Sequence, residues 1–354
     1  MRWKVLTPFT RKRGAASWIP AQVAQIDPAQ VFEVVPAHYQ HDRSRKVSGG
    51  REWLDYFLHA ARSWTGMLLS RQVGYVTAFP QLPMMLGLLK RLCRSRAPIL
   101  AWCFNMGRTY DGRKGQLARF GLSTVDTFVV HSRQEIETYS TWLGLPRERF
   151  VFVPLSIDVV ELDGQDHEDS AQPFLVAMGS ANRDYRSLVS AVRALGYPTI
   201  IIASAHALQG IELPPNVEVR SGLSLAECHA LCRRARVNVI PVDNETTASG
   251  QVTLLEAMMY AKAVVATDCV GTRDYVTEGV TGLLVPPHDV GALTAAIERL
   301  WQDTALRQSI GAHARQYVES HVSFKAVAVE MQRLLALLEA ERGGTLGRRR
   351  ARAA

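Results

Sequence analysis

Several features that mark particular classes of protein are missing from this chain of 354 residues. Its 5 cysteines are an odd number, spread from Cys93 to Cys269, so they do not form a disulfide framework. The most apolar window, residues 79–92, contains two prolines and a basic pair and is well short of the roughly 20 apolar residues that a membrane-spanning helix needs. Residues 1–13 lack the apolar core of a signal peptide. We therefore expect a cytoplasmic protein with reduced thiols.

The net charge of +8 is concentrated in the first half of the chain. Residues 1–160 carry 22 Lys and Arg against 11 Asp and Glu, whereas residues 161–354 carry 19 against 22. Such an excess is compatible with an ordinary solvated surface, and it also favours an anionic membrane surface, an anionic substrate or nucleic acid. No recognised nucleic-acid-binding motif occurs, and the basic run at 348–352 is too short to carry such binding. We therefore expect no nucleic-acid partner.

Short apolar, β-branched runs alternate with longer helical stretches along most of the chain, and 47% of the residues are hydrophobic. This order predicts parallel sheets with helices on both faces. Strands are expected at 4–7, 31–36, 74–78, 99–103, 127–131, 150–154, 174–178, 199–203, 217–220, 237–241, 263–267 and 282–285. Helices are expected at 51–70, 82–94, 115–122, 133–143, 185–195, 225–233, 251–261, 273–278, 290–302, 305–320 and 323–342.

The length suits two domains of about 150 residues each. The acidic stretch at 161–173, which contains Gly and Pro but no apolar periodicity, is the expected linker. Ligands of open α/β sheets bind beyond the carboxyl ends of the strands, so two doubly wound, Rossmann-like domains facing each other make a cleft. The expected organisation is an N-terminal domain at 1–160, a C-terminal domain at 174–320, a helix at 321–342 that packs back towards the N-terminal domain, and a disordered basic tail at 343–354.

The most informative segment is 241–259, where a predicted strand ends, a loop of small polar residues follows and an apolar helix begins. Thr247 and Ser249 are typical helix-capping residues, and a helix N-terminus near Gly250 favours an anion such as a diphosphate. Glu256 falls on the stripe of this helix that is predicted to face the core, where an unpaired carboxylate is costly. Either a structural ion pair or a hydrogen bond to a ligand hydroxyl would relieve that cost.

A series of phrases follows in register: Leu-Leu-Glu-Ala-Met at 254–258, Ala-Lys-Ala-Val-Val-Ala-Thr at 261–267, Gly-Thr at 271–272, Asp-Tyr-Val at 274–276 and Gly-Val-Thr-Gly-Leu-Leu-Val-Pro-Pro-His-Asp at 279–289. Together they resemble the nucleotide-sugar-binding domain of the family 4 glycosyltransferases, which are retaining enzymes of the GT-B fold. The resemblance is dense over 237–320 and weaker over 174–236. In the first half it is one of layout, with a phrase at 129–135.

The resemblance implies roles for the residues that match the family's motifs. Glu256 corresponds to the glutamate that binds the nucleotide ribose. A second family glutamate, which contacts the donor sugar, is replaced by Ala248, and Gln251 stands where the family usually has glycine. The chain is similar to a variant subgroup reading Ala-Ser-Gly-Gln-x-x-Leu-Leu-Glu-Ala-Met, in which either Glu245 or the turn at 249–251 would contact the sugar.

Further donor contacts are implied near the starts of both domains. The family usually has a Gly-Arg pair after the first strand of the second domain and a lysine soon after, all near the diphosphate. Gly179 matches the glycine, Ser180 replaces the arginine, and Arg183 falls at the lysine position, where a guanidinium suits bidentate phosphate contact or is simply solvated. Gly222 would line the base pocket, and Gly14 remains of a Gly-Gly turn. The expected donor-binding residues are Gly14, Gly179, Arg183, Gly222, Thr247, Ser249, Gly250, Gln251 and Glu256.

The catalytic residues are not identified by the sequence. Asn105 and His131, which follow predicted strands, and Glu245 are the candidates for the cleft, although a lone histidine is more often a capping or packing residue. No Asp-x-Asp motif occurs, and the two cysteines of the segment 228–232 have no second ligand pair at zinc spacing. We therefore expect no metal and no other cofactor. In the family's usual front-face substitution the leaving phosphate oxygen deprotonates the acceptor, so no protein nucleophile is required.

The resemblance implies a metal-independent, hexosyltransferase-type enzyme. It would move a sugar from a nucleotide sugar to a saccharide or lipid-linked acceptor during synthesis of a cell-surface polysaccharide, lipopolysaccharide or glycolipid. The alternatives are a sugar-nucleotide epimerase of the same fold and a catalytically inactive nucleotide-sugar-binding scaffold. Segments 51–70 and 82–96 combine aromatic and aliphatic residues with basic ends, which is typical of interfacial helices and also of helices that cover a sheet. Peripheral attachment to the inner face of the cytoplasmic membrane is therefore a further hypothesis.

Overall fold

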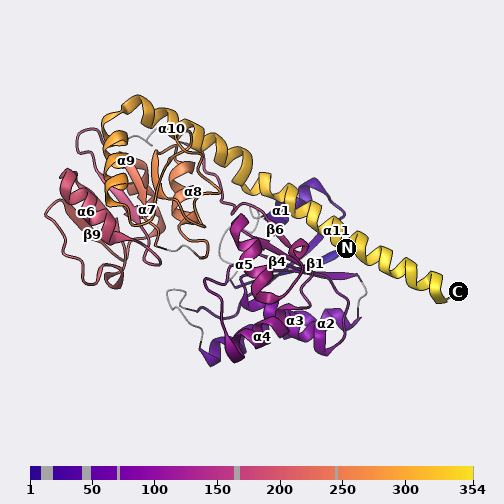
Figure 1. Cartoon of the computed structure of the whole chain (residues 1–354). Helices are drawn as coiled ribbons and strands as arrows, with labels where there is room; N and C mark the ends of the chain where they lie inside the picture. The colour runs from indigo at the N-terminus through magenta and orange to yellow at the C-terminus, as the bar shows by residue number, and fades with distance from the viewer. Residues whose placement is uncertain (9–18, 42–48, 70–71, 163–167, 244–245, 354) are drawn as a thin grey trace. The chain divides into compact units, whose positions relative to one another are not determined.

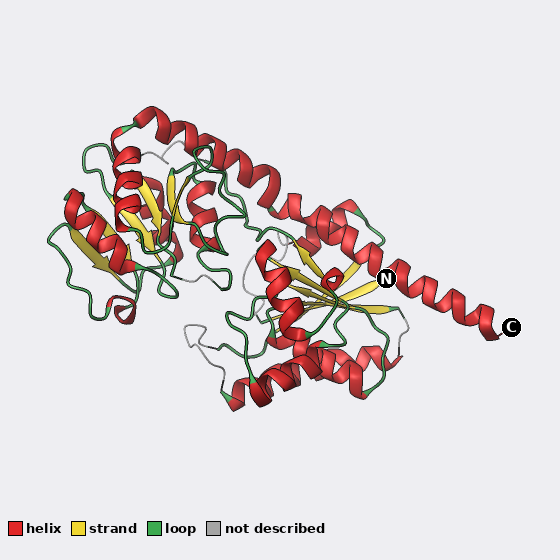
Figure 2. Ribbon diagram, in the orientation of Figure 1, coloured by secondary structure: helices red, strands yellow, loops and turns green. Residues whose placement is uncertain are grey.

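The computed structural model describes residues 1–8, 19–41, 49–69, 72–162, 168–243 and 246–353 (Figure 1). Two expected site residues, Gly14 and Glu245, lie outside these ranges. The chain divides into two compact units: unit 1 is Met1–Pro154 with Phe324–Ala354, and unit 2 is Leu155–Ser323. Each unit contains one six-stranded sheet in which neighbouring strands run parallel (Figure 2). The predicted α/β class with two doubly wound sheets is confirmed.

The sheet of unit 1 has the strand order β2-β1-β3-β4-β5-β6. Residues of β3 and β4 are buried throughout, because helices cover both faces of the sheet. Successive residues point to opposite faces, so Tyr75 and Val76 belong to different apolar clusters. The strands are β1 (Arg2–Thr7), β2 (Val31–Pro36), β3 (Val73–Ala78), β4 (Ile99–Trp102), β5 (Thr127–Val130) and β6 (Phe150–Phe152).

Two sets of helices cover the sheet of unit 1. One face carries α2 (Gly50–Leu69), α3 (Gln81–Leu92), α4 (Gly112–Leu122) and α5 (Arg133–Leu143). The other face carries α1 (Ile19–Ile26) and α11 (Phe324–Ala353), which packs against α1 from the far end of the chain. A short 3-10 turn, η1 (Arg147–Arg149), leads into β6.

The sheet of unit 2 has the order β12-β11-β10-β7-β8-β9, so its first strand, β7, pairs with β10 on one side and β8 on the other. The strand order reverses at β7, and ligands bind at the carboxyl ends of the strands at such a switch point. The strands are β7 (Leu175–Met178), β8 (Thr199–Ile202), β9 (Val217–Arg220), β10 (Val237–Ile240), β11 (Val264–Thr267) and β12 (Leu283–Val285).

Helices also cover both faces of this second sheet. One face carries α6 (Tyr185–Leu195) and α9 (Val290–Gln302), and the other carries α7 (Leu225–Arg234) and α8 (Gln251–Met259). Helix α10 (Thr304–Tyr317) contacts α8 and α9 and continues into the turn Val318–Val322. A 3-10 turn, η2 (Ala205–Leu208), follows β8.

All twelve predicted strands occur, with ends that differ by at most two residues, but other expectations need correction. The helix expected at 273–278 is wrong: residues 270–275 form turns, because the N–H of Thr277 bonds Thr281 Oγ1 and ends the helical pattern. Helix α1 was not expected. The units divide at residues 154/155 and 323/324, since residues 155–159 pack on the second core. Residues 343–353, expected to be disordered, continue α11.

Candidate active site

The loops that follow β7 and β10 pair with each other at the carboxyl edge of the second sheet. The N–H of Asp184 donates to Pro241 O at 2.9 Å, and the N–H of Asp243 donates to Asn182 O at 3.1 Å. His288, which follows β12, lies between two carboxylates, with Nδ1 3.1 Å from Asp184 and Nε2 3.5 Å from Asp243. Three loops are thereby held together beside the switch point at β7.

The start of α8 is packed tightly against this edge. Gly250 is the N-cap residue with a φ of 82°, and a Cβ there would lie 2.6 Å from Val242 Cγ2. Only glycine fits such a position without strain. Ser249 accepts a hydrogen bond from Asn182 Nδ2 at 3.0 Å, and Thr247 is buried. The helix therefore starts at glycine rather than at a Thr247 or Ser249 cap, and its positive end lies beside the β7 loop.

Arg183 places a cation at the same edge. Its Nε donates to Met178 O at 3.0 Å, Nη1 to Ala181 O at 2.9 Å and Nη2 to Thr253 Oγ1 at 3.2 Å. The guanidinium lies over Gly179, whose φ is +118° and where a Cβ would come within 2.6 Å of Nη2. Burial lowers the pKa of Arg183, yet a guanidinium stays charged at neutral pH. A desolvated cation beside a helix N-terminus is well suited to an anionic ligand.

Glu256 lies on the side of α8 that faces α7. Its Oε1 is 3.2 Å from Nε2 of His229, whose Nδ1 is 2.9 Å from the hydroxyl of Tyr260. The side chain of Glu256 is 16% exposed, so one edge of the carboxylate reaches solvent. The core-facing stripe predicted for this helix, which contains Glu256 and also Val252 one turn earlier, is wrong at Val252, whose side chain is 54% exposed. The segment 228–232, whose two cysteines have no second ligand pair at zinc spacing, supplies the histidine that contacts Glu256.

Gln251 is turned into the core rather than towards solvent. The residue is 7% exposed, and its Nε2 donates to the hydroxyl of Tyr275 at 3.0 Å. The same hydroxyl accepts the N–H of Leu155 at 2.9 Å. The side chain expected to help bind the donor therefore links α8 to the first residue of unit 2, and its backbone remains at the start of the helix.

Gly222 and Ser180 occupy the loops that follow β9 and β7. Gly222 is exposed with a φ of +71°, and a Cβ there would meet no described atom within 4 Å. Just after it, α7 starts with a capping box between Ser224 and Glu227. Ser180, which replaces the family arginine, accepts the N–H of Ser204 at 2.9 Å and so fixes the loop after β8. Gly222 borders open space, as a pocket residue requires.

The candidates in unit 1 lie at the carboxyl ends of β4 and β5. Asn105 Oδ1 accepts the N–H of Gly107 at 2.7 Å. His131 is 4% exposed, and its Nδ1 donates to Val153 O at 2.7 Å. Because a carbonyl accepts from Nδ1, that nitrogen carries the proton of the neutral ring, and burial lowers the pKa of His131 to about 4. At neutral pH His131 is thus an uncharged group and not a counter-ion for phosphate.

The burial of neutral His131 predicts a loss of stability in acid. The unfolded histidine takes up a proton near its ordinary pKa of 6.5, whereas the folded one does so only near pH 4. The stabilisation is complete above pH 6.5 and is lost between there and pH 4. Urea unfolding at pH 7.5 and pH 5 should show a loss about 2 kcal/mol larger in the wild type than in His131→Asn, whose amide can keep the bond to Val153. Equal losses in the two proteins would contradict this.

Residues 175–303 match the family model described as glycosyl transferases group 1. The chain is 34% identical over 110 residues to an exopolysaccharide phosphotransferase of Streptomyces coelicolor. It is 31% identical over 96 residues to the capsular polysaccharide biosynthesis glycosyltransferase CapM of Staphylococcus aureus. These alignments cover 31% and 27% of this chain but only 11% and 25% of the two relatives. The similarity is therefore confined to part of each protein.

Similarity of fold extends over nearly the whole chain. The structure of HepE from Anabaena in complex with UDP superposes with a TM-score of 0.67 at 13% identity, covering 95% of this chain and 100% of that one. The two chains share their fold, which is the predicted GT-B arrangement of two Rossmann-like sheets. In the described part of the chain no helix has the length and apolar character needed to cross a bilayer. Likewise, no group of three His, Cys, Asp or Glu side chains in those ranges is arranged to hold a metal ion.

Proposed function

We propose that this chain is a glycosyltransferase that uses a nucleotide sugar as donor. The observation that carries the proposal is the convergence, at the switch point of the second sheet, of Arg183, the N-terminus of α8 and Glu256 one and a half turns further along that helix. A cation and a helix dipole suit a diphosphate, and a mostly buried carboxylate with one edge towards solvent suits the hydroxyls of a ribose. The match over 175–303 to the group 1 glycosyl transferases supports this interpretation.

The finer proposal is a retaining, metal-independent reaction of the family 4 type. Arg183 and the α8 N-terminus stabilise the departing diphosphate. The leaving phosphate oxygen removes the proton of the acceptor hydroxyl as the new glycosidic bond forms. Ala248, which replaces the family's sugar-binding glutamate, is 7% exposed and has no polar side chain. We therefore expect the backbone of the 249–251 turn to contribute to binding the sugar.

The test is a donor screen followed by a product assay. Thermal shift with nucleoside diphosphates, starting from UDP because HepE was crystallised with it, identifies the base. Candidate nucleotide sugars are then incubated with polysaccharide and lipid-linked acceptors, and the anomeric configuration of the product is read by NMR. A retained configuration supports the proposal. Isomerisation of the donor without an acceptor would identify an epimerase instead, and nucleotide binding without turnover over the acceptor panel would indicate a scaffold.

We also propose that unit 1 binds an anionic membrane surface, where a lipid-linked acceptor of capsule-type synthesis would be held. Neighbouring helices α2, α3 and α4 expose apolar side chains on their outer side, and Arg91 lies over the ring of Phe120 at 4.3 Å. Tyr56 and Trp64, two aromatic residues of the segment 51–70 with the composition of an interfacial helix, are core residues. The exposed apolar residues are Leu54, Leu58, Leu92, Leu117 and Phe120, and the exposed cations near them are Arg94, Arg96, Arg113, Lys114 and Arg119.

Vesicle flotation tests this membrane proposal. The protein should float with vesicles that contain anionic lipid and remain unbound with neutral ones, since basic side chains and apolar anchors act together. The double variant Leu117→Ser/Phe120→Ser should bind about thirty-fold more weakly, because each of the two inserted apolar side chains contributes roughly 1 kcal/mol. Val329→Ser, an equally exposed site on α11, is the matched control. Equal flotation of the wild type with neutral and anionic vesicles would overturn the proposal. Equal flotation of the double variant and of Val329→Ser would overturn it as well.

A further inference from the structure

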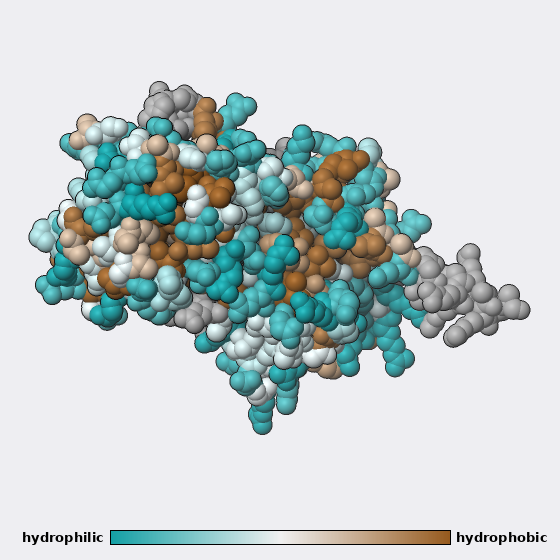
Figure 3. Space-filling model, turned by 45° about the horizontal axis from the view of Figure 1, so that its top comes forward, coloured by the Kyte–Doolittle hydropathy of each residue, from teal (hydrophilic) through white to brown (hydrophobic). Residues whose placement is uncertain are grey.

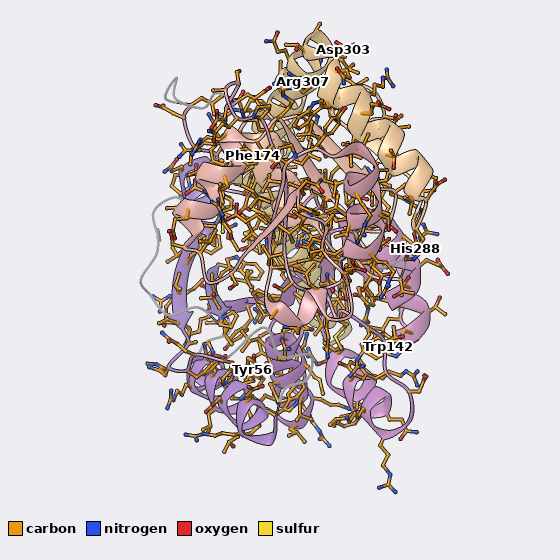
Figure 4. The ribbon with its side chains drawn as sticks, turned by 90° about the vertical axis from the view of Figure 1, so that its left-hand side faces the viewer. Tyr56, Trp142, Phe174, His288, Asp303 and Arg307 are labelled. Carbon is orange, nitrogen blue, oxygen red and sulfur yellow. The ribbon has the colours of Figure 1, made fainter. Side chains whose placement is uncertain are left out.

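A pocket of about 590 Å³ opens at the edge of the second sheet that is opposite the candidate active site. Arg236 directly precedes β10 and Lys262 lies two residues before β11, so both line it from the amino ends of strands. Figure 4 shows Arg307 and Phe174 towards one end of unit 2 and His288, from the carboxyl edge, towards the other. The volume is in the range of small-molecule sites. The face of the molecule shown in Figure 3 has hydrophobic patches among hydrophilic residues.

The cations of this pocket are fixed by the fold. Arg307 on α10 is 7% exposed; its Nη1 donates to Leu300 O at 2.8 Å, and its Nη2 donates to Glu168 Oε2 at 3.1 Å. Lys262 is 8% exposed. Such burial of two cations is costly unless anionic or polar groups are nearby. The arrangement is therefore a built site rather than a cluster of solvated surface charges.

Arg236 has donor capacity left over. Among the described residues its side chain forms one hydrogen bond, from Nε to Glu168 Oε1, and its guanidinium lies 4.7 Å over the ring of Trp301. Stacking and the Glu168 bond orient the guanidinium and leave Nη1 and Nη2 for a further acceptor. Arg236, Lys262 and Arg307 contribute three cations to the described lining and Glu168 contributes one carboxylate, so this lining is basic.

We propose that this pocket binds the phosphate group of a small phosphorylated metabolite. A phosphomonoester carries nearly two negative charges at neutral pH, which suits a basic lining, and its oxygens accept the fork of N–H donors that Arg236 presents. Ser170 and Thr304 add hydroxyl groups to the lining, and Gln308 adds an amide. The site is separate from the donor site because the length of β10 lies between them.

Calorimetric titration at constant ionic strength tests the proposal, with inorganic phosphate and glycerol 3-phosphate as probes and glycerol as the uncharged control. Wild-type protein should bind both anions saturably in the millimolar range or tighter and should not bind glycerol. Arg236→Gln and Lys262→Gln should each weaken binding by about ten-fold or more, as loss of a charge-assisted contact does. The two variants are independent, so misfolding of one, checked by circular dichroism, leaves the other as the test.

Two controls separate this site from the donor site. Arg183→Gln removes the cation of the candidate active site, so the titrations are repeated in this background, where phosphate bound beside α8 no longer contributes, and Arg193→Gln, at an exposed position of α6, is a surface control. No activity is measured, so failure of the proposed transferase function does not affect the result. The proposal is overturned if wild-type protein shows no saturable phosphate binding, or if Arg183→Gln abolishes binding that Arg236→Gln and Lys262→Gln retain.

Discussion

Replacing Glu256 with alanine is expected to weaken the binding of the nucleoside diphosphate found in the donor screen by roughly 10- to 100-fold. A hydrogen bond to a charged group contributes about 1.5–3 kcal/mol, and the exposed edge of the Glu256 carboxylate offers such a bond to ribose hydroxyls. Inorganic pyrophosphate has no ribose, so its affinity should be the same in both proteins. Calorimetry with the nucleotide and with pyrophosphate measures both quantities.

The controls for this prediction come from α9 and α7. Glu298→Ala removes an exposed carboxylate from the opposite face of the sheet and should leave nucleotide affinity unchanged. His229→Gln removes the ring that holds Glu256 Oε1 and should cause a smaller loss than Glu256→Ala, because the carboxylate remains. Unchanged nucleotide affinity in a folded Glu256→Ala protein would sink the ribose assignment and leave Glu256 as a structural partner of His229.

The strands could be predicted because their signal is local. In a doubly wound sheet each strand is buried on both faces, so runs such as Ile99–Trp102 and Thr199–Ile202 are continuously apolar and bounded by polar turns. Helix α1 carries a weaker signal. Its eight residues bury only Ile19, Pro20 and Val23, and what they pack against includes α11, more than 300 residues away in the chain. Tertiary packing of that kind has no periodicity that a local pattern can show.

The residues of the candidate site likewise form two groups, those with a local sequence signal and those whose contacts depend on tertiary packing. Gly179, Arg183, Gly250 and Glu256 could be named from motifs, because the first three follow a strand or start a helix and Glu256 lies at a fixed spacing after the start of α8. Their partners could not, since the contact of His229 with Glu256 depends on how α7 packs on α8. The inward orientation of the Gln251 side chain also depends on tertiary packing, because its partner is Tyr275. Tyr275 lies in a segment of turns that was predicted to be helical. Polar partners are set by tertiary packing, whereas the motif residues are set by backbone geometry.

Arg183→Ala is expected to weaken nucleoside diphosphate binding by roughly 10- to 100-fold while leaving the affinity for the corresponding nucleoside nearly unchanged. The guanidinium lies beside the N-terminus of α8 with its pKa lowered by burial, so a phosphate group that arrives there relieves a desolvated charge. Arg183→Lys keeps the charge but loses the planar guanidinium that donates to both Met178 O and Thr253 Oγ1. Its affinity for the nucleoside diphosphate should therefore lie between those of the wild type and Arg183→Ala. Calorimetry with the nucleoside, its monophosphate and its diphosphate measures the series.

The comparison between ligands decides whether Arg183 acts on phosphate or only on the loop. Its three hydrogen bonds to Met178, Ala181 and Thr253 also tie the β7 loop to α8, so removing them can displace the whole edge. A displaced edge would weaken nucleoside and nucleoside diphosphate by the same factor, whereas loss of a phosphate contact weakens only the phosphorylated ligands. Arg186→Ala, on the exposed side of α6 three residues later, is the matched control and should change neither. Equal losses for all three ligands would therefore assign Arg183 to the architecture of the site and move the diphosphate contact to the N-terminus of α8 alone.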